Sequence, residues 1–153
     1  MRIASCALAG RTGHEAGRAL LAALYRKETG LDLPPIAIAA GGKPYFPDSG
    51  WHFSVSHTPR RAFCALSRRE IGIDAEELDV KLALAEKILS PKEKAQFDAA
   101  PDKRRALLTF WVLKEARVKR TGEGLRGYPN KTDFSLDDPR VTEMDGCLVA
   151  VIE

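Results

Sequence analysis

The stretch from Arg104 to Leu125 constrains the fold most, because it predicts one long helix. Asp102 precedes it as a candidate N-cap, and Gly122 and Gly124 are candidate stops near its end. Its apolar side chains recur at helical spacing, which is typical of a helix that packs one face against a core. These side chains are Leu107, Leu108, Trp111, Val112 and Val118.

A charged pair follows the aromatic residue of this helix. Glu115 and Lys119 lie four and eight residues after Trp111, so the three side chains share one stripe of the helix. The simplest interpretation is an exposed Glu-to-Lys pair that steadies a surface helix by a few tenths of a kcal/mol. On this helix alone, that interpretation is the better one.

A second element changes this balance. The segment Ile71–Glu76 alternates as a short strand, with Asp74 and Glu76 on the same face. Two carboxylates on one strand face repel each other, so a cation is expected between them. Magnesium takes oxygen ligands from a few carboxylates together with substrate phosphates, and Glu115 could supply a third carboxylate.

Length, composition and charge bound the class of protein. A chain of 153 residues with 44% apolar content can bury one core, which predicts a single domain over 1–153. A net charge of +3 suits a phosphorylated ligand or an acidic partner, although a solvated surface explains each basic pair equally well. Three cysteines without metal-ligand spacing are typical of reduced thiols in the cytoplasm. No apolar run approaches the ~20 residues that span a bilayer, so no membrane association is expected.

Helical and strand patterns alternate along the rest of the chain. Strands are expected in the first ten residues and over 51–56, 62–66, 132–136 and 147–152, with an extended segment over 36–40. Helices are expected over 14–29, 82–89 and 91–99, the last with Ser90 as N-cap. The apolar face of the first helix is expected to hold Ala16, Leu20, Leu21, Ala23 and Leu24.

Candidate anion ligands lie in three places. Arg18 lies near the start of the first helix, where anions are attracted, although solvent exposure is the commoner fate of such a residue. Lys43 lies on a tight turn. Ser56 and His57 cannot form a nucleophilic dyad, because adjacent strand residues point to opposite faces. His57 therefore suits a phosphate donor or, equally, a structural histidine that caps the turn.

Four short motifs follow one another in a specific order. They are Gly42-Lys43-Pro44, Phe53-Ser54-Val55-Ser56-His57-Thr58, Gly72-Ile73-Asp74-Ala75-Glu76 and Trp111-Val112-Leu113-Lys114-Glu115-Ala116. Their order and spacing, over roughly residues 42–134, resemble the 4'-phosphopantetheinyl transferases, in particular the broad-specificity class that activates non-ribosomal peptide and polyketide synthetases. The resemblance implies an α+β fold whose two similar halves each pack a long helix on a small antiparallel sheet, with the active site at their junction.

The resemblance also implies a reaction. The phosphopantetheine arm of coenzyme A would move to a serine of an acyl or peptidyl carrier protein, with Mg²⁺ bound and 3',5'-ADP released. Asp74, Glu76 and Glu115 look like the magnesium ligands, and Glu115 also looks placed to help deprotonate the serine. Lys119 is similar to the family lysine that neutralises the pyrophosphate.

Contacts with coenzyme A are implied at further positions. Lys43 and Pro44 look like the loop that lines the adenine, and Ser56 and His57 look like ligands of the 3'-phosphate region. The full set of implied cofactor-binding residues is Arg18, Lys43, Pro44, Ser56, His57 and Lys114.

Two alternatives stay open. Only 41 residues precede Gly42, which implies a reduced N-terminal half (1–67) beside a C-terminal half (68–153) that carries the metal site. Such a chain could bind coenzyme A or a carrier protein without transferring anything. A small basic module that binds nucleic acid is the other alternative. It is disfavoured because the basic pairs are scattered and the aromatic residues take core-like positions. The oligomeric state stays open.

Overall fold

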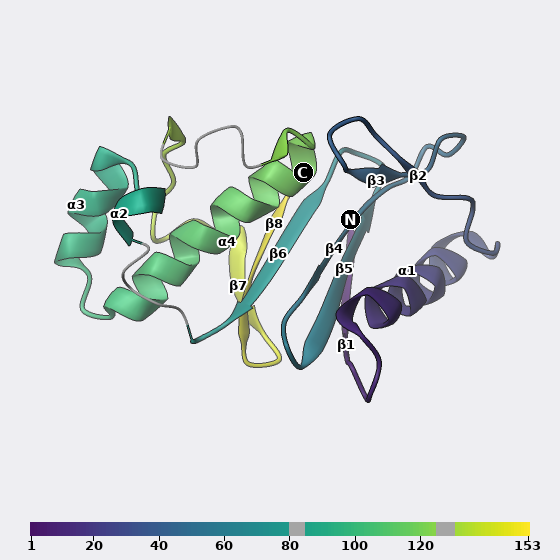
Figure 1. Cartoon of the computed structure of the whole chain (residues 1–153), viewed down its shortest axis with the longest axis horizontal. Coiled ribbons are helices and arrows are strands. Elements are labelled where there is room, and N and C mark those ends of the chain that lie inside the picture. The colour runs from purple at the N-terminus through teal and green to yellow at the C-terminus, as the bar shows by residue number, and fades with distance from the viewer. Residues whose placement is uncertain (80–84, 125–130) are drawn as a thin grey trace.

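The computed structural model describes residues 1–79, 85–124 and 131–153 and shows two halves built alike (Figure 1). Each half packs one long helix on a three-stranded antiparallel sheet. In the first half, helix α1 (Gly13–Thr29) packs on the sheet β1-β5-β4, formed by β1 (Arg2–Ala7), β4 (His52–His57) and β5 (Arg61–Ser67). In the second half, helix α4 (Lys103–Thr121) packs on the sheet β6-β8-β7, formed by β6 (Gly72–Glu77), β7 (Val141–Met144) and β8 (Cys147–Ile152).

Smaller elements complete the chain. A two-stranded hairpin of β2 (Ala37–Ile38) and β3 (Pro44–Tyr45) follows α1, while α2 (Ala85–Ile88) and α3 (Pro91–Ala99) precede α4. The predicted α+β fold with a long helix on a small antiparallel sheet in each half is therefore confirmed. Among the described residues, no helix combines the length and apolar character needed to cross a membrane.

Local signals fix the helix ends. Thr12 and Glu15 form a capping box at the start of α1, and Gly30 ends the helix in the left-handed conformation. Asp102 caps α4 by accepting a hydrogen bond from the backbone of Arg105 at 2.9 Å. Both helices begin one residue before the predicted start, and α1 ends where predicted. α4 ends at Thr121, before the first candidate stop Gly122 and four residues before the predicted end. The predicted apolar face of α1 is wrong at Ala23, which is exposed because the helix turns that position away from the sheet.

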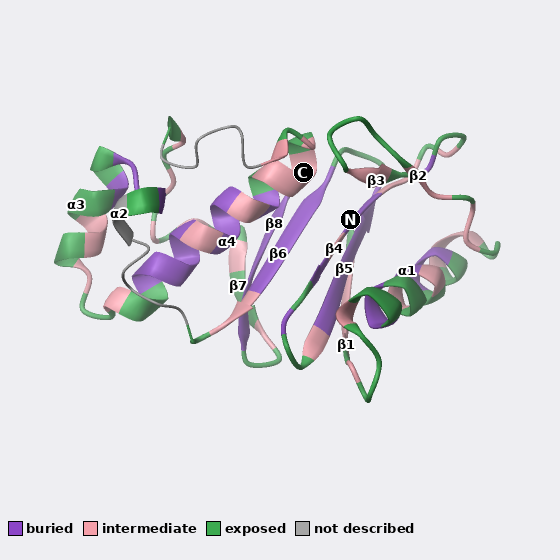
Figure 2. Ribbon diagram, viewed as in Figure 1, coloured by how far each residue is buried: buried purple, intermediate pink, exposed green. Residues whose placement is uncertain are grey.

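The molecule has four layers, in the order α1, first sheet, second sheet, α4 (Figure 2). The predicted alternation of β6 is confirmed, because Ile71, Ile73 and Ala75 pack into the core between the sheets while Asp74 faces α4. Gly72 brings α4 close to β6, since a Cβ at that position would lie 1.9 Å from the carbonyl oxygen of Ala116.

The two sheets meet along a seam between β4 and β6 (Figure 1). The strands belong to different sheets, and serine side chains of β4 bridge them to the backbone of β6. Ser54 Oγ accepts a hydrogen bond from the N–H of Ile73 at 3.1 Å, and Ser56 Oγ accepts one from the N–H of Ala75 at 3.3 Å. Serine side chains of the first half thus bond to the backbone of the second half at their junction.

The prediction of a strand over 132–136 is wrong. The backbone of this segment bonds to side chains rather than to a neighbouring strand: Phe134 N–H donates to Glu93, and Leu136 N–H donates to Gln96. Conversely, β7 is a strand that the sequence analysis missed. The predicted helix over 82–89 is seen as Ala85–Ile88, and its first three residues, like Leu125 of the long helix, lie outside the described residues.

Candidate active site

Three carboxylates gather where α4 crosses β6. Asp74 and Glu76 project from β6 toward the helix, and Glu115 projects from α4. Trp111, one helical turn before Glu115, donates its indole N–H to Glu76 Oε1 at 3.2 Å. The helical stripe and the strand face predicted from the sequence therefore meet at one place.

Asp74 is the most enclosed of the three. Its Oδ1 atom lies 2.6 Å from Lys119 Nζ and 2.9 Å from Ser56 Oγ. Its Oδ2 atom is buried and has no hydrogen-bond partner among the described residues. Burial raises the pKa of the Asp74 carboxyl, and the ammonium of Lys119 opposes that shift only in part. The second oxygen of this carboxylate is a buried acceptor without a donor, which is costly unless a cation or another donor reaches it.

The negative charge of Asp74 acts on the other two carboxylates, Glu76 and Glu115. Burial raises the pKa of Glu76 and of Glu115, and the charge of Asp74 adds to the rise in both. Three acidic oxygen donors that repel one another suit a hard divalent cation. In the part of the chain that the structure describes, no three His, Cys, Asp or Glu side chains converge in metal-ligand geometry. Lys119 and Trp111 donate hydrogen bonds to one oxygen each of Asp74 and Glu76. The residues fit a cation by their chemistry. Asp74 Oδ2 has no partner among the described residues, so Glu76 and Glu115 are the side chains that would turn toward a bound cation.

Lys119 connects the carboxylates to a cavity of about 260 Å³. The loop around Lys43, strand β4 and the last turn of α4 surround this cavity, so it lies at the junction of the halves. Val118, Lys119 and Gly122 line it from α4 and its C-cap, and Phe53 and Ser54 line it from β4. A ligand in this cavity would therefore meet an ammonium group that is already paired with Asp74.

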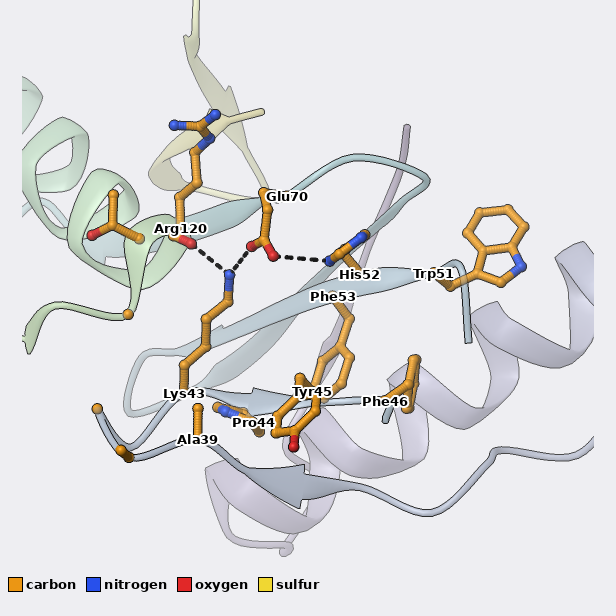
Figure 3. A pocket seen from close by; sticks show the side chains of 14 residues that line it. Ala39, Lys43, Pro44, Tyr45, Phe46, Trp51, His52, Phe53, Glu70 and Arg120 are labelled. Carbon is orange, nitrogen blue, oxygen red and sulfur yellow. Dashed lines mark hydrogen bonds and ion pairs between the residues drawn. The ribbon is translucent and has the colours of Figure 1, made fainter. Parts of the chain in front are cut away.

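A second cavity, of about 560 Å³, adjoins the first, and Figure 3 shows its lining. Lys43 and Pro44 line both cavities, which is consistent with the predicted place of this loop at a ligand site. Apolar and aromatic side chains form one side of the larger cavity and ionic groups the other. The side chains named in Figure 3 include Tyr45, Phe46, Trp51, His52, Phe53, Glu70 and Arg120.

Lys43 fastens its loop to the second half (Figure 3). Its ammonium group donates to the carboxylate of Glu70 and to the carbonyl oxygen of Arg120 at the end of α4. His52 Nδ1 lies 3.2 Å from the other oxygen of Glu70, and the hydrogen bond from Lys43 lowers the pKa of Glu70. Gly41 permits the close approach, because a Cβ there would lie 2.1 Å from the carbonyl oxygen of Gly122. Sequence reasoning missed Glu70, which precedes the carboxylate strand without any motif of its own.

The other predicted ligands of coenzyme A are spread over the first half. His57 is exposed at the end of β4, on the opposite face from Ser56, and its ring packs against Gly13 at the start of α1. Arg18 is exposed on α1. Neither residue lines the two cavities at the junction. The structure therefore separates these two residues from the loop of Lys43, and their contacts with coenzyme A stay predictions.

Two further predicted ligands of coenzyme A, Lys114 and Ser56, are buried in this structure. Lys114 is fully buried, with Nζ 2.8 Å from Glu93 Oε2 and 2.8 Å from the carbonyl oxygen of Thr132, so it serves an internal ion pair and lines neither cavity. Burial lowers the pKa of Lys114, and Glu93 opposes that shift. Ser56 is buried as well, and its hydroxyl donates to Asp74 and accepts from Lys119. Contacts of Lys114 and Ser56 with coenzyme A stay predictions. Glu93, the partner of Lys114, also forms a capping box with Ser90 at the start of α3.

The fold and site define an α+β protein of two similar halves with an acidic cluster and a lysine at their junction. A family model described as the 4'-phosphopantetheinyl transferase superfamily matches residues 70–146. The chain belongs to this superfamily. The match includes β6 and α4, which carry all three carboxylates.

Curated relatives of the chain carry the name of this family. A 4'-phosphopantetheinyl transferase of Bacillus subtilis is 34% identical over 117 residues, covering 71% of this chain and 51% of that protein. The transferase Sfp of Bacillus subtilis strain 168 is 36% identical over 89 residues, covering 55% of this chain and 39% of that protein. The crystal structure of Thermotoga maritima holo-acyl-carrier-protein synthase aligns with a TM-score of 0.48 and 27% identity over 54% of this chain and 60% of that one. The chain spans about half the length, or less, of these two curated relatives.

Proposed function

We propose that this protein transfers the 4'-phosphopantetheine arm of coenzyme A to a serine of an acyl or peptidyl carrier protein, with Mg²⁺ bound, and releases 3',5'-ADP. Membership of the superfamily supports this reaction. The observation that carries it is the acidic cluster at the junction of the halves, where Asp74, Glu76 and Glu115 share one site with Lys119.

The reaction requires a base and a sink for negative charge. The serine oxygen of the carrier forms a bond to the phosphorus that bears pantetheine, and the bond from that phosphorus to the bridging pyrophosphate oxygen breaks. The electron pair of the broken bond leaves with 3',5'-ADP, and the serine proton passes to a base. Magnesium, when bound by Asp74, Glu76 and Glu115, would neutralise charge on the pyrophosphate.

The protein groups fit these needs. The pKa of Glu115 is raised by burial and by the charge of Asp74, which suits a carboxylate that accepts a proton during the reaction. Lys119 lines the smaller cavity and supplies a positive charge for the departing phosphate. Lys43 and Pro44 line both cavities and suit contacts with the nucleotide part of coenzyme A.

The test is the intact mass of an apo carrier protein after incubation with this protein, coenzyme A and Mg²⁺. We expect the carrier to gain the mass of one phosphopantetheine arm and to gain nothing when a chelator is present. Because both peptidyl and acyl carriers are expected substrates, the assay should include one of each. Coenzyme A binding by calorimetry without any gain on several carriers would instead support the non-catalytic alternative.

A pair of carboxylate variants makes this test specific. Glu115→Gln removes the proposed base and metal ligand while keeping the side-chain size, so we expect the mass gain to disappear. Glu143→Gln is the matched control, because Glu143 is an exposed carboxylate on β7 that pairs with Arg105. Full transfer by Glu115→Gln would contradict the proposed roles of Glu115.

A further inference from the structure

We infer that Ser56 is a positioning residue: its hydroxyl holds one oxygen of Asp74 together with Lys119 and so leaves the other oxygen for the cation. This inference rests on the proposed function, because it assigns the serine to the metal site of that reaction. It differs from the role implied by family resemblance, in which Ser56 belongs to the 3'-phosphate region of coenzyme A.

The bonding capacity of a hydroxyl group carries the argument. A serine hydroxyl offers one donor and two acceptor positions. Ser56 donates to Asp74 Oδ1 at 2.9 Å, and it accepts from Lys119 Nζ at 3.0 Å and from the N–H of Ala75 at 3.3 Å. All three positions are used, so the hydroxyl has no donor left for a phosphate.

Two donors, the Ser56 hydroxyl and the Lys119 ammonium group, decide which oxygen of Asp74 is available. Lys119 and Ser56 both contact Oδ1, whereas Oδ2 is buried and has no partner among the described residues. Two charge-assisted hydrogen bonds to the same oxygen oppose small rotations of the carboxylate. Ser56 thus acts on the site from across the seam, since it belongs to β4 of the first half and Asp74 to β6 of the second.

Ser54 provides an internal control. It lies two residues before Ser56 on the same strand, it is also buried, and its hydroxyl also accepts a backbone N–H of β6, from Ile73 at 3.1 Å. It has no hydrogen bond to Asp74 or Lys119 among those in the described part of the chain. Loss of the Ser54 hydroxyl removes one bond of the seam, whereas loss of the Ser56 hydroxyl removes two, one of them the bond to Asp74.

The experiment measures cation binding without coenzyme A or a carrier. Free Mn²⁺ is titrated against the whole chain by electron paramagnetic resonance, as a spectroscopic substitute for Mg²⁺. We expect Ser56→Ala to weaken Mn²⁺ binding about tenfold or more, as is typical when a hydrogen bond to a metal ligand is lost. Ser54→Ala should bind Mn²⁺ as the unaltered protein does.

Kinetics then separate positioning from coenzyme A binding. With an apo carrier, Ser56→Ala should lower kcat and leave KM for coenzyme A unchanged, whereas loss of a phosphate ligand would raise that KM. If Ser56→Ala does not fold, the equally shaped Ser56→Thr and Ser56→Val decide, because only threonine keeps the hydroxyl. Threonine is expected to retain Mn²⁺ binding that valine loses.

Three outcomes would overturn the inference. They are equal Mn²⁺ binding by Ser54→Ala and Ser56→Ala, equal binding by the threonine and valine variants, and no Mn²⁺ binding by the unaltered chain. The proposed function is tested separately by the carrier mass. A chain that binds Mn²⁺ with the expected dependence on Ser56 and yet modifies no carrier would retain the inference and refute the transfer reaction.

Discussion

Two lysines of α4 pair with buried carboxylates, and the two pairs differ in what they leave unsatisfied. Lys114 and Glu93 are 2% and 0% exposed, and the oxygens of Glu93 also accept the backbone N–H groups of Ser90 and Phe134. Lys119 is 31% exposed, and its partner Asp74 keeps one buried oxygen without a donor. The first pair is closed on itself, while the second still has an open position.

This difference shows how to tell a structural ion pair from a functional one. Burial alone does not separate them, because both carboxylates are enclosed. What separates them is whether both carboxylate oxygens have partners. Both oxygens of Glu93 do, and its contacts hold α3, α4 and the segment around Phe134 together. Asp74 has spare bonding capacity, and its partner Lys119 lines the smaller cavity.

The largest expected effect comes from breaking the closed pair. Lys114→Met keeps the length of the side chain and removes its charge, which leaves Glu93 as a buried carboxylate without a cation. We expect the free energy of unfolding to fall by about 3–5 kcal/mol, as for other buried pairs that lose one partner. Urea unfolding followed by circular dichroism measures this change. A loss below about 1 kcal/mol would mean that the pair is not the structural contact described here.

The same lysine-to-methionine substitution in the Lys119–Asp74 pair should lower activity more than stability. Lys119→Met removes the proposed charge for the departing phosphate, so we expect the rate of arm transfer to fall about 100-fold. The free energy of unfolding should fall by about 1 kcal/mol, because Lys119 is partly solvated and solvent screens its pair with Asp74. Carrier mass against time gives the rate. Equal destabilisation by the Lys114 and Lys119 variants would remove the distinction between the two pairs.

The sequence predicts the acidic site better than it predicts the partners of its lysines. The alternation of 71–76 and the spacing of Trp111, Glu115 and Lys119 place side chains correctly, because the local periods of strand and helix set those directions. Lys114 shares the motif with Glu115, yet it precedes Lys119 by five positions, about 140° around the helix, and so faces another layer.

What the sequence could not predict depends on residues distant along the chain. Glu93 meets Lys114 and Phe134, and Glu70 meets Lys43, through contacts that no local pattern encodes. The segment 132–136 has the composition of a strand, but its backbone N–H groups donate to side chains of α3 instead of to a neighbouring strand. The seam between β4 and β6 is equally hidden, since Ser54 and Ser56 look like ordinary strand residues until the two sheets are set side by side.

A third lysine pair, Lys43 with Glu70, sharpens the comparison because its carboxylate is open to solvent. Glu70 is 54% exposed, and it helps to hold the loop that lines both cavities against the end of α4. Since exposed pairs contribute up to about 1 kcal/mol, Glu70→Gln should raise KM for coenzyme A at most about fivefold with kcat unchanged. Steady-state kinetics with an apo carrier measure both constants. Glu123→Gln, an exposed carboxylate just after α4, is the control. A lower kcat with unchanged KM would contradict a role for Glu70 in holding that loop.

The smallest effect is the pH dependence of the Lys43–Glu70 pair. The pKa of Glu70 is lower than its ordinary value of 4.5, chiefly because Lys43 donates a hydrogen bond to the carboxylate. The folded protein therefore binds this proton more weakly than the unfolded chain does, so the ion pair stabilises the fold above the unfolded pKa and loses that contribution as pH falls through the folded pKa. Glu70→Gln should cost stability at about pH 7 and cost progressively less below about pH 4.5. Urea unfolding of both proteins across this range measures the difference, which solvent screening keeps within about 1 kcal/mol. A difference that grows on acidification would mean that Glu70 is held in its protonated form, and the pair with Lys43 would then not be an ion pair.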